Sequence, residues 1–221
     1  MPSPVIEVPI APPSLPPQQR YPNALVHRST VSTMTATPEG FTRMYCIPRI
    51  LEDEEMDGLI ALARSEGLTA GTTSGGGNDP RIRRSQVMWL RRADGHGWLY
   101  ERIWAQIEKM NREVFGFDIT DFNGAIQLAR YDASDEGFYN WHMDNGDKNS
   151  GRKISFSVQL SHADDYEGGN LELWYKMRGI AASRERGAIV AFPSFVMHRV
   201  TPVTRGERFS LVAWIIGPRW R

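Results

Sequence analysis

The chain has 221 residues, of which 41% are apolar and 24% charged, so one compact domain with a sizeable core is the default expectation. Lysine plus arginine equals aspartate plus glutamate, at 26 each, which argues against nucleic acid or an anionic membrane as the main partner. The single cysteine, Cys46, excludes an intramolecular disulfide and a cysteine-based zinc site. No apolar run is long enough to span a membrane and the first residues do not resemble a signal peptide, so we expect a soluble, cytoplasmic protein.

Prolines dominate the beginning of the chain. Residues 1–24 include eight of them, and proline has no backbone N–H to donate in a ladder or a helix interior. The segment is therefore predicted to be a proline-rich flexible arm, with a strap packed on the domain as the alternative. A single domain is expected over residues 41–221, with helical support over 50–115 and a jelly-roll core over 118–218.

The first part of this domain has helical periodicity. Residues 50–63 place apolar side chains on one stripe after an acidic first turn, and Gly67 is the expected stop. Residues 96–115 show the clearest amphipathic pattern and should end at Gly116. Between the two helices, the glycine-rich loop 71–80 lacks the Lys-Ser/Thr ending of a phosphate-binding loop.

A small basic cluster follows this loop and precedes a predicted strand over 86–90. Its members are Arg81, Arg83 and Arg84. We expect a solvated edge there, and the alternative is a surface that meets an acidic substrate.

After residue 118 the pattern changes to short strands separated by turn residues. The predicted strands are 125–131, 153–161, 170–175, 188–192 and 208–216. Helices followed by about a hundred residues of strand predict an α+β, mainly β fold: a double-sheet jelly roll, or barrel, buttressed by N-terminal helices.

Three polar residues in the β half suit a metal site. His142 and Asp144 are two residues apart, so on an extended segment both side chains point to the same side. His198 follows some fifty residues later. Two imidazoles and one carboxylate leave coordination positions open on ferrous iron, although zinc accepts the same ligands. A turn role for Asp144 beside Asn145-Gly146 is the other alternative.

Arg208 lies ten residues after His198 and begins an alternating run. Strand alternation puts four residues of this run on one face: Arg208, Ser210, Val212 and Trp214. If that face is interior, the buried guanidinium needs an anionic partner, and a dicarboxylate cosubstrate would supply it. A surface salt bridge is the alternative for Arg208.

The ordered set resembles the iron(II)- and 2-oxoglutarate-dependent dioxygenases, and most closely their prolyl-4-hydroxylase-like branch with its bacterial and phage members. The resemblance rests on His142-x-Asp144, then His198, then Arg208 with Ser210. It extends over about residues 80–218. Further support comes from Tyr131 and from the segments 152–155, 167–171, 192–194, 198–204 and 206–208.

This resemblance implies a double-stranded β-helix with iron at its mouth. The implied metal ligands are His142, Asp144 and His198. Arg208 would bind the distal carboxylate of 2-oxoglutarate, and Tyr131 and Ser210 would add hydrogen bonds to this cosubstrate. Core packing is the alternative for Tyr131, and Gln127, on the same strand face, is a further pocket candidate.

The implied reaction consumes O2 and 2-oxoglutarate, hydroxylates an unactivated C–H bond and releases succinate and CO2, with ascorbate as a stimulant to test. Related halogenases have a halide in place of the metal-binding carboxylate, so Asp144 favours hydroxylation. Animal collagen-type enzymes have lysine where this chain has Arg208, which weakens any transfer of collagen-like substrate preference.

The first hypothesis for the substrate is an amino acid residue of a peptide or protein, or a free amino acid, with prolyl as the first guess. A natural-product intermediate or a nucleobase is the alternative within the same reaction. A different class would be a non-catalytic jelly-roll module that binds a metal or a 2-oxo acid, and a zinc hydrolase is a third option. The sequence does not indicate an oligomeric state.

Overall fold

The computed structural model describes residues 6–7, 44–73, 77–175 and 177–220. In this part of the chain the α-helices are α1 (Asp53–Glu66) and α2 (Gly97–Met110). The larger sheet has ten strands, eight of them in the order β1 (Ile6–Glu7), β2 (Tyr45–Ile47), β13 (Ile189–Pro193), β9 (Arg152–Gln159), β15 (Val203–Ile216), β7 (Ile126–Asp132), β5 (Gln86–Leu90) and β3 (Thr69–Ala70). Two further strands, β6 (Asp121–Phe122) and β10 (Tyr166–Gly168), also pair with β15. The smaller sheet has five strands in the order β12 (Arg178–Ala181), β11 (Leu171–Tyr175), β14 (His198–Val200), β8 (Phe138–His142) and β4 (Arg83–Arg84).

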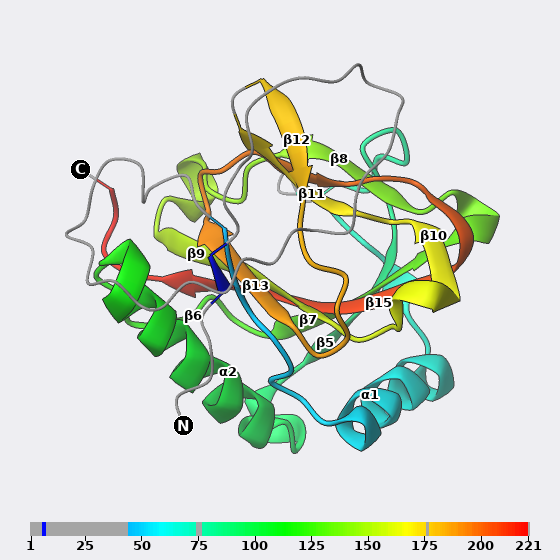
Figure 1. Ribbon diagram of the computed structural model, residues 1–221, viewed down its shortest axis with the longest axis horizontal. Helices are drawn as coiled ribbons and strands as arrows, with labels where there is room; N and C mark the ends of the chain where they lie inside the picture. The colour runs from blue at the N-terminus through cyan, green and yellow to red at the C-terminus, as the bar shows by residue number, and fades with distance from the viewer. Residues whose placement is uncertain (1–5, 8–43, 74–76, 176, 221) are drawn as a thin grey trace.

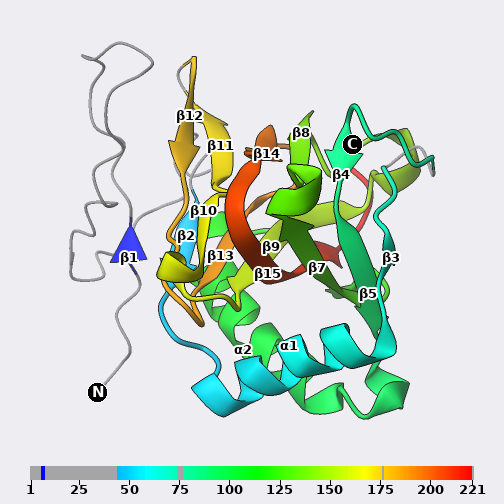
Figure 2. The same cartoon turned by 90° about the vertical axis from the view of Figure 1, so that its right-hand side faces the viewer.

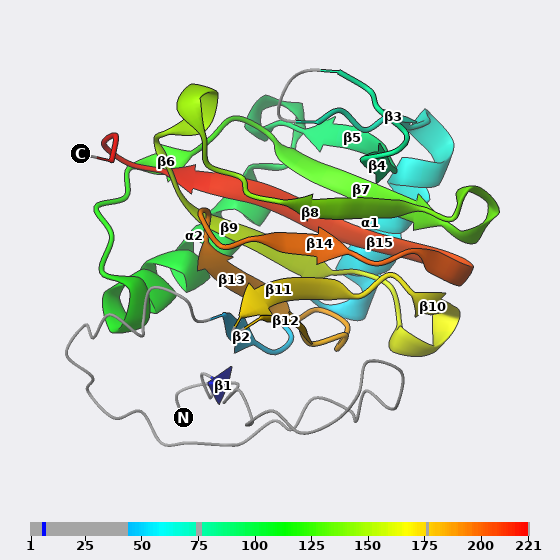
Figure 3. The ribbon, with the colours of Figure 1, turned by 90° about the horizontal axis from the view of Figure 1, so that it is seen from above.

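The two sheets face each other, and both helices lie against the outer face of the larger one (Figure 1). Figure 2 shows the resulting layers, with α1 and α2 below the larger sheet and the smaller sheet above it. Seen from above, the strands β8, β14 and β11 of the smaller sheet lie over the larger sheet and are inclined only slightly to β15 (Figure 3). This is the mainly β jelly roll with helical support that the sequence predicts.

The helix α1 begins and ends three residues later than the predicted range of 50–63. A capping box sets its start, because the Glu52 side chain accepts from the N3 backbone and the Glu55 side chain accepts from the Glu52 N–H. Leu51 is fully buried, but it precedes the helix. The predicted stop at Gly67 is confirmed, with a φ of 80°.

The helix α2 and a π-helical turn that follows it, Asn111–Phe115, cover almost the whole predicted range of 96–115. Gly116 ends the turn in the left-handed region, with a φ of 64°. The apolar stripe packs against the larger sheet, and its fully buried members are Leu99, Ile103, Ile107 and Met110.

The two faces of the larger sheet have different roles, which β15 shows best. Its odd-numbered residues from 209 to 215 pack in the core shared with the helices: Phe209, Leu211, Ala213 and Ile215. The even-numbered residues from 208 to 214 therefore point toward the smaller sheet, as the alternation of the sequence predicts. The strand itself begins five residues before the predicted start, because its first part pairs with β10.

Most of the predicted proline-rich arm, residues 1–24, lies outside the described residues. Within it, Ile6–Glu7 forms β1 and pairs with β2. The division into an arm and a single domain over 41–221 stays a prediction. Within the described residues, no helix has the length and apolarity that crossing a lipid bilayer requires.

Candidate active site

Neighbouring strands of the smaller sheet bring the two predicted histidine ligands together. His198, the first residue of β14, pairs directly with His142, the last residue of β8. Their ring centroids are 4.1 Å apart. The extended segment predicted to hold both His142 and Asp144 ends at His142, and Asp144 lies in a bend two residues later, where its N–H donates to the Ser194 carbonyl.

The side chains of His142, Asp144 and His198 nevertheless converge. Asp144 Oδ1 lies 3.7 Å from His142 Nε2, and Asp144 Oδ2 lies 3.3 Å from His198 Nε2. One ligand atom from each residue lies within 4.8 Å of the other two. In the described part of the chain, this is the one group of His, Cys, Asp or Glu side chains that could hold a metal ion together.

Both imidazoles are oriented through their Nδ1 atoms. Nδ1 of His142 lies 2.8 Å from the Asn140 carbonyl oxygen, and Nδ1 of His198 lies 2.9 Å from that of Val196. A carbonyl oxygen only accepts, so each Nδ1 carries a proton, and in the neutral ring Nε2 then has a free lone pair. This arrangement supports metal-binding histidines in other proteins.

Burial and charge set the protonation of the three side chains. Burial, helped by His198 and by the guanidinium of Arg83, lowers the pKa of His142 to about 3. Burial would lower the pKa of His198 as well, but the adjacent Asp144 carboxylate raises it. Burial would raise the pKa of Asp144, yet the two histidines and the Ser155 hydroxyl hold it well below its usual value. His142 and Asp144 therefore need not release a proton at neutral pH to bind a cation.

A serine from the larger sheet positions the carboxylate. Ser155 Oγ, in β9, donates to Asp144 Oδ2 at 2.6 Å and shares a 3.0 Å hydrogen bond with Ser194 Oγ. Both serines are buried. The bend that carries Asp144 is thus fixed through its side chain by Ser155 and through its backbone by Ser194.

Substitution Ser155→Ala should lower metal affinity by about tenfold to a hundredfold, because a group that orients a ligand typically contributes that much. Isothermal titration of the metal-free protein with Co(II) or anaerobic Fe(II) measures the change. Ser157→Ala is the matched control, since Ser157 lies on the same face of β9 but has no hydrogen bond to Asp144 among the described residues. Equal affinities for the two variants would contradict the positioning role.

Arg208 lies in the same space as the three converging side chains, buried at 4% exposure. Its Nε donates to Gln159 Oε1 at 3.1 Å, and its guanidinium carbon lies 5.7 Å from the centroid of the Tyr131 ring. Within the described residues no carboxylate lies within ion-pair distance of Arg208. The surface salt bridge considered for this residue is therefore wrong, and the guanidinium is a buried cation without an anion among the described residues.

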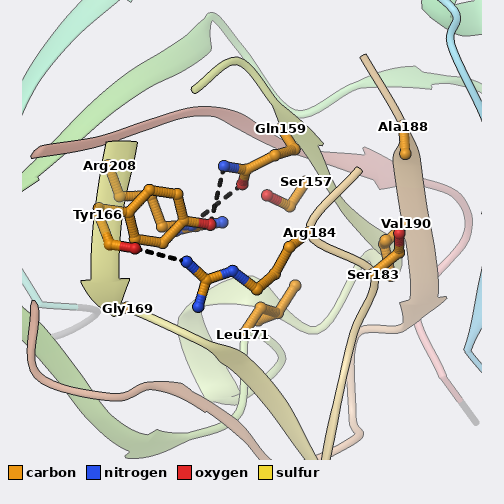
Figure 4. A pocket seen from close by; sticks show the side chains of 10 residues that line it. All are labelled: Ser157, Gln159, Tyr166, Gly169, Leu171, Ser183, Arg184, Ala188, Val190 and Arg208. Carbon is orange, nitrogen blue, oxygen red and sulfur yellow. Dashed lines mark hydrogen bonds between the residues drawn. The ribbon is translucent and has the colours of Figure 1, made fainter. Parts of the chain in front are cut away.

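The cavity between the sheets has an empty volume of about 490 Å³, including the part open to solvent. Its lining includes all three converging side chains together with Arg208, Tyr131, Gln127 and Trp214. A smaller space of about 270 Å³ lies against the other side of Arg208, where Gln159, Tyr166 and Arg184 form a hydrogen-bonded wall (Figure 4).

Tyr131 and Ser210, the two residues predicted to hydrogen-bond the cosubstrate beside Arg208, lie in different surroundings. Tyr131 is buried and lines the larger cavity. Ser210 is fully buried, its Oγ has no hydrogen-bond partner within the described residues, and it is not among the residues that line either cavity. Hydrogen bonds from both to 2-oxoglutarate stay predictions.

Arg83, Tyr139 and the positioning residue Ser155 line the cavity but were not predicted there from the sequence. Arg83, expected at a solvated edge, is only 6% exposed and lines the cavity, whereas Arg81 and Arg84 are exposed. Tyr139 stacks on His142 with ring centroids 3.5 Å apart. The sequence carries no signal for Tyr139, because a residue three before His142 on an extended segment should point to the opposite side. A bulge between β8 and β14 brings both rings to the cavity.

Comparison with known proteins agrees with this geometry. Residues 126–216, which contain the converging side chains and Arg208, match the profile of the 2OG-Fe(II) oxygenase superfamily. The matched segment is therefore similar to that superfamily. The resemblance found in the sequence is thereby confirmed, and the prolyl-4-hydroxylase-like branch is supported by the relatives and structures below.

Similar sequences are PKHD-type hydroxylases. This chain is 40% identical to the one from Hyphomonas neptunium over 82 residues, which cover 35% of this chain and 37% of the relative. The corresponding protein of Idiomarina loihiensis is 34% identical over 91 residues, 41% of each chain. The matches thus span little more than a third of the length of these curated relatives.

Solved structures share the fold. A prolyl-4-hydroxylase of Pseudomonas putida superposes with a TM-score of 0.64 at 21% identity, over 79% of this chain and 92% of that one. A prolyl hydroxylase of Trichoplax adhaerens, solved with a peptide fragment of hypoxia inducible factor, gives 0.67 at 20% identity, over 79% and 83%. At this identity the likeness establishes the jelly-roll fold.

Proposed function

We propose that this chain is an Fe(II)- and 2-oxoglutarate-dependent hydroxylase. The observation that carries the proposal is the placement of Arg208, a buried cation without an anionic partner in the described part of the chain, in the same cavity as His142, Asp144 and His198. The superfamily match supports iron, 2-oxoglutarate and O2 as the reactants held there.

The donor set fits a divalent ion. His142, Asp144 and His198 present two Nε2 atoms and one carboxylate on one side of the cavity, and the remaining coordination positions would face the open space. Asp144 supplies the protein carboxylate whose place a halide takes in halogenases, so the proposal is hydroxylation. Bound iron and 2-oxoglutarate would supply the oxidising power for a C–H bond, with succinate and CO2 as coproducts.

Arg208 fits the far end of 2-oxoglutarate. Its Nε is occupied by Gln159, which fixes the plane of the guanidinium and leaves both terminal nitrogens for a carboxylate. The Tyr131 ring lies beside it, and its hydroxyl is our candidate for an added hydrogen bond to the cosubstrate. The apolar wall of Phe156, Val212 and Trp214 limits water around these groups.

For the substrate we propose an amino acid residue in a peptide or protein, or a free amino acid, with prolyl as the first candidate. The support comes from the two solved structures of similar fold described above, which are prolyl hydroxylases, one of them solved with a peptide. A natural-product intermediate or a nucleobase is the competing substrate within the same reaction.

The proposal is tested by incubating the protein with Fe(II), 2-oxoglutarate, ascorbate and O2, with and without pools of peptides and metabolites, and measuring succinate. We expect slow succinate release without substrate and stimulation by one pool, together with a product heavier by one oxygen atom. If the purified protein binds no iron and releases no succinate under any condition, it is a non-catalytic module. Turnover with Zn(II) that needs neither O2 nor 2-oxoglutarate would instead identify a hydrolase.

A further inference from the structure

A second buried guanidinium, that of Arg83, opens onto the proposed active site. Arg83 lies in β4, at the edge of the smaller sheet, and pairs with Tyr139 of β8. Figure 2 shows β4 at the same end of the molecule as β8. The guanidinium carbon of Arg83 lies 4.7 Å from the centroid of the Tyr139 ring. The Tyr139 ring in turn stacks on the imidazole of His142. The charge of Arg83 is therefore one aromatic ring away from a proposed metal ligand.

Three neutral acceptors hold this guanidinium in place. Its Nε donates to Ser85 Oγ at 2.6 Å, its Nη1 to the Thr72 carbonyl at 2.8 Å and its Nη2 to Gln127 Oε1 at 2.8 Å. An arginine has five N–H donors, so one on Nη1 and one on Nη2 are left. Because Gln127 belongs to β7 of the larger sheet, the group bridges the two sheets across the cavity.

The backbone at Gly71 is shaped around the same group. A Cβ at Gly71 would lie 2.4 Å from Ser85 Oγ, which accepts from Arg83 Nε, 2.7 Å from Arg83 Nε and 2.9 Å from Arg83 Cζ, closer than real contacts allow. The Gly71 N–H also donates to the Ser85 carbonyl at 2.8 Å. A loop that approaches so closely fixes the guanidinium in one position, which a merely solvated arginine would not need.

No carboxylate in the described part of the chain lies within ion-pair distance of Arg83. The charges that line the cavity are those of Arg83, Arg208 and Asp144. With a divalent ion bound, they leave an excess of three positive charges, and the two carboxylates of 2-oxoglutarate remove two of these. One positive charge is left, and an enclosed cation of this kind is stabilised by an anion.

We propose that Arg83 binds a carboxylate of the substrate, so that the enzyme acts on a free amino acid or on the C-terminal residue of a peptide. The two remaining donors, one on each terminal nitrogen, match the two oxygens of a carboxylate. The inference rests on the proposed function and narrows its substrate class. It also assigns Arg83 as the residue that distinguishes an acid from the corresponding neutral amide.

The test measures binding rather than turnover. The protein is loaded with Zn(II) and 2-oxoglutarate, and saturation-transfer NMR screens the proteinogenic amino acids in four forms: free acids, N-acetyl acids, N-acetyl amides and tetrapeptides ending in each residue. We expect at least one acid to bind and its amide to bind about tenfold to a hundredfold more weakly. Tighter binding of the free amino acid would indicate a metabolite as the substrate. Tighter binding of the N-acetyl acid or the tetrapeptide would indicate the C-terminal residue of a peptide.

Variants assign the preference to Arg83. Arg83→Gln should weaken the best acid by about tenfold to a hundredfold and leave its amide unchanged, with Arg83→Lys in between. Gly71→Ala, which keeps the charge but crowds both Ser85 Oγ and the guanidinium that it holds, should weaken binding of the acid as well. The matched control is Arg81→Gln, because Arg81 is exposed and bonded to Asp79.

Several outcomes would overturn the inference. They are acids and amides that bind equally well, binding of no acid at all, and an Arg83→Gln variant that loses both forms alike or loses 2-oxoglutarate. Thermal unfolding and 2-oxoglutarate binding are measured for each variant to detect a folding defect. If Arg83→Gln has such a defect, the affinities of Arg83→Lys and Gly71→Ala for the acid and its amide decide whether Arg83 binds the carboxylate. Failure of the proposed function is seen separately, as a wild-type protein that neither binds 2-oxoglutarate nor releases succinate.

Discussion

Replacing His198 by alanine should abolish metal binding at the proposed site and, with it, turnover of 2-oxoglutarate. The variant keeps His142 and Asp144 but loses one of three donors that lie within 4.8 Å of one another. Loss of a group that only supports a ligand lowers metal affinity by about tenfold to a hundredfold, so loss of a ligand should exceed a hundredfold. Asp144 Oδ2 also loses the imidazole nitrogen 3.3 Å away.

Co(II) titration followed by absorbance measures the affinity, and succinate release measures turnover. His162→Ala is the matched control, because His162 is exposed and its Nε2 contacts Arg186. The control should bind the metal as the wild type does. A His198→Ala variant with unchanged metal affinity would show that the ion is held elsewhere and would remove the basis of the proposed site.

Long periodic segments were predictable from the sequence, and their ends were less so. The stripe of α2 and the alternation of β15 each repeat over several turns or residue pairs, so both elements were found. The start of α1 depends on a single pair of side chains, Glu52 and Glu55, that cap each other. Leu51 is a buried apolar residue in line with the stripe, but it precedes the helix. Counting it as helical placed the predicted start of α1 too early.

The candidate ligands were predictable because residue type and order carry the signal. Their meeting is a property of strand pairing, which no local pattern contains. The strand β14 has only three residues, too few for periodicity, yet its register places His198 opposite His142. Asp144 is held by a bend bonded to Ser194, which the two-residue spacing alone cannot specify.

Arg83 shows the limit of local reasoning most clearly. Three arginines within four residues read as a solvated edge, because charge runs usually are solvated. The sequence contains no sign that the middle one turns inward, since this depends on pairing with β8 and on the close approach of Gly71. Arg208 could be placed because it stands in a long alternating strand, whereas β4 has two residues.

Substitution Arg208→Gln should raise the KM for 2-oxoglutarate roughly a hundredfold while leaving metal affinity within about threefold of wild type, since hydrogen bonds to charged groups contribute about 1.5–3 kcal/mol each. Glutamine keeps a polar partner near Gln159 and avoids a large cavity. Arg205→Gln is the matched control, because Arg205 lies on the same strand but is exposed and paired with Glu167. Succinate release at varied 2-oxoglutarate gives both KM values, and Co(II) titration gives the metal affinity.

A second cosubstrate makes the test specific for the carboxylate that Arg208 is proposed to bind. 2-Oxopentanoate keeps the keto acid end of 2-oxoglutarate but lacks the distal carboxylate, so wild-type protein should use it poorly. If Arg208 contacts that carboxylate, the preference for 2-oxoglutarate should nearly vanish in Arg208→Gln, because the two changes remove the same interaction. A preference that persists, together with a rise in the KM for the substrate, would exchange the roles proposed for Arg208 and Arg83. The two guanidinium groups share one cavity, so the cosubstrate and the substrate must be varied separately in both variants.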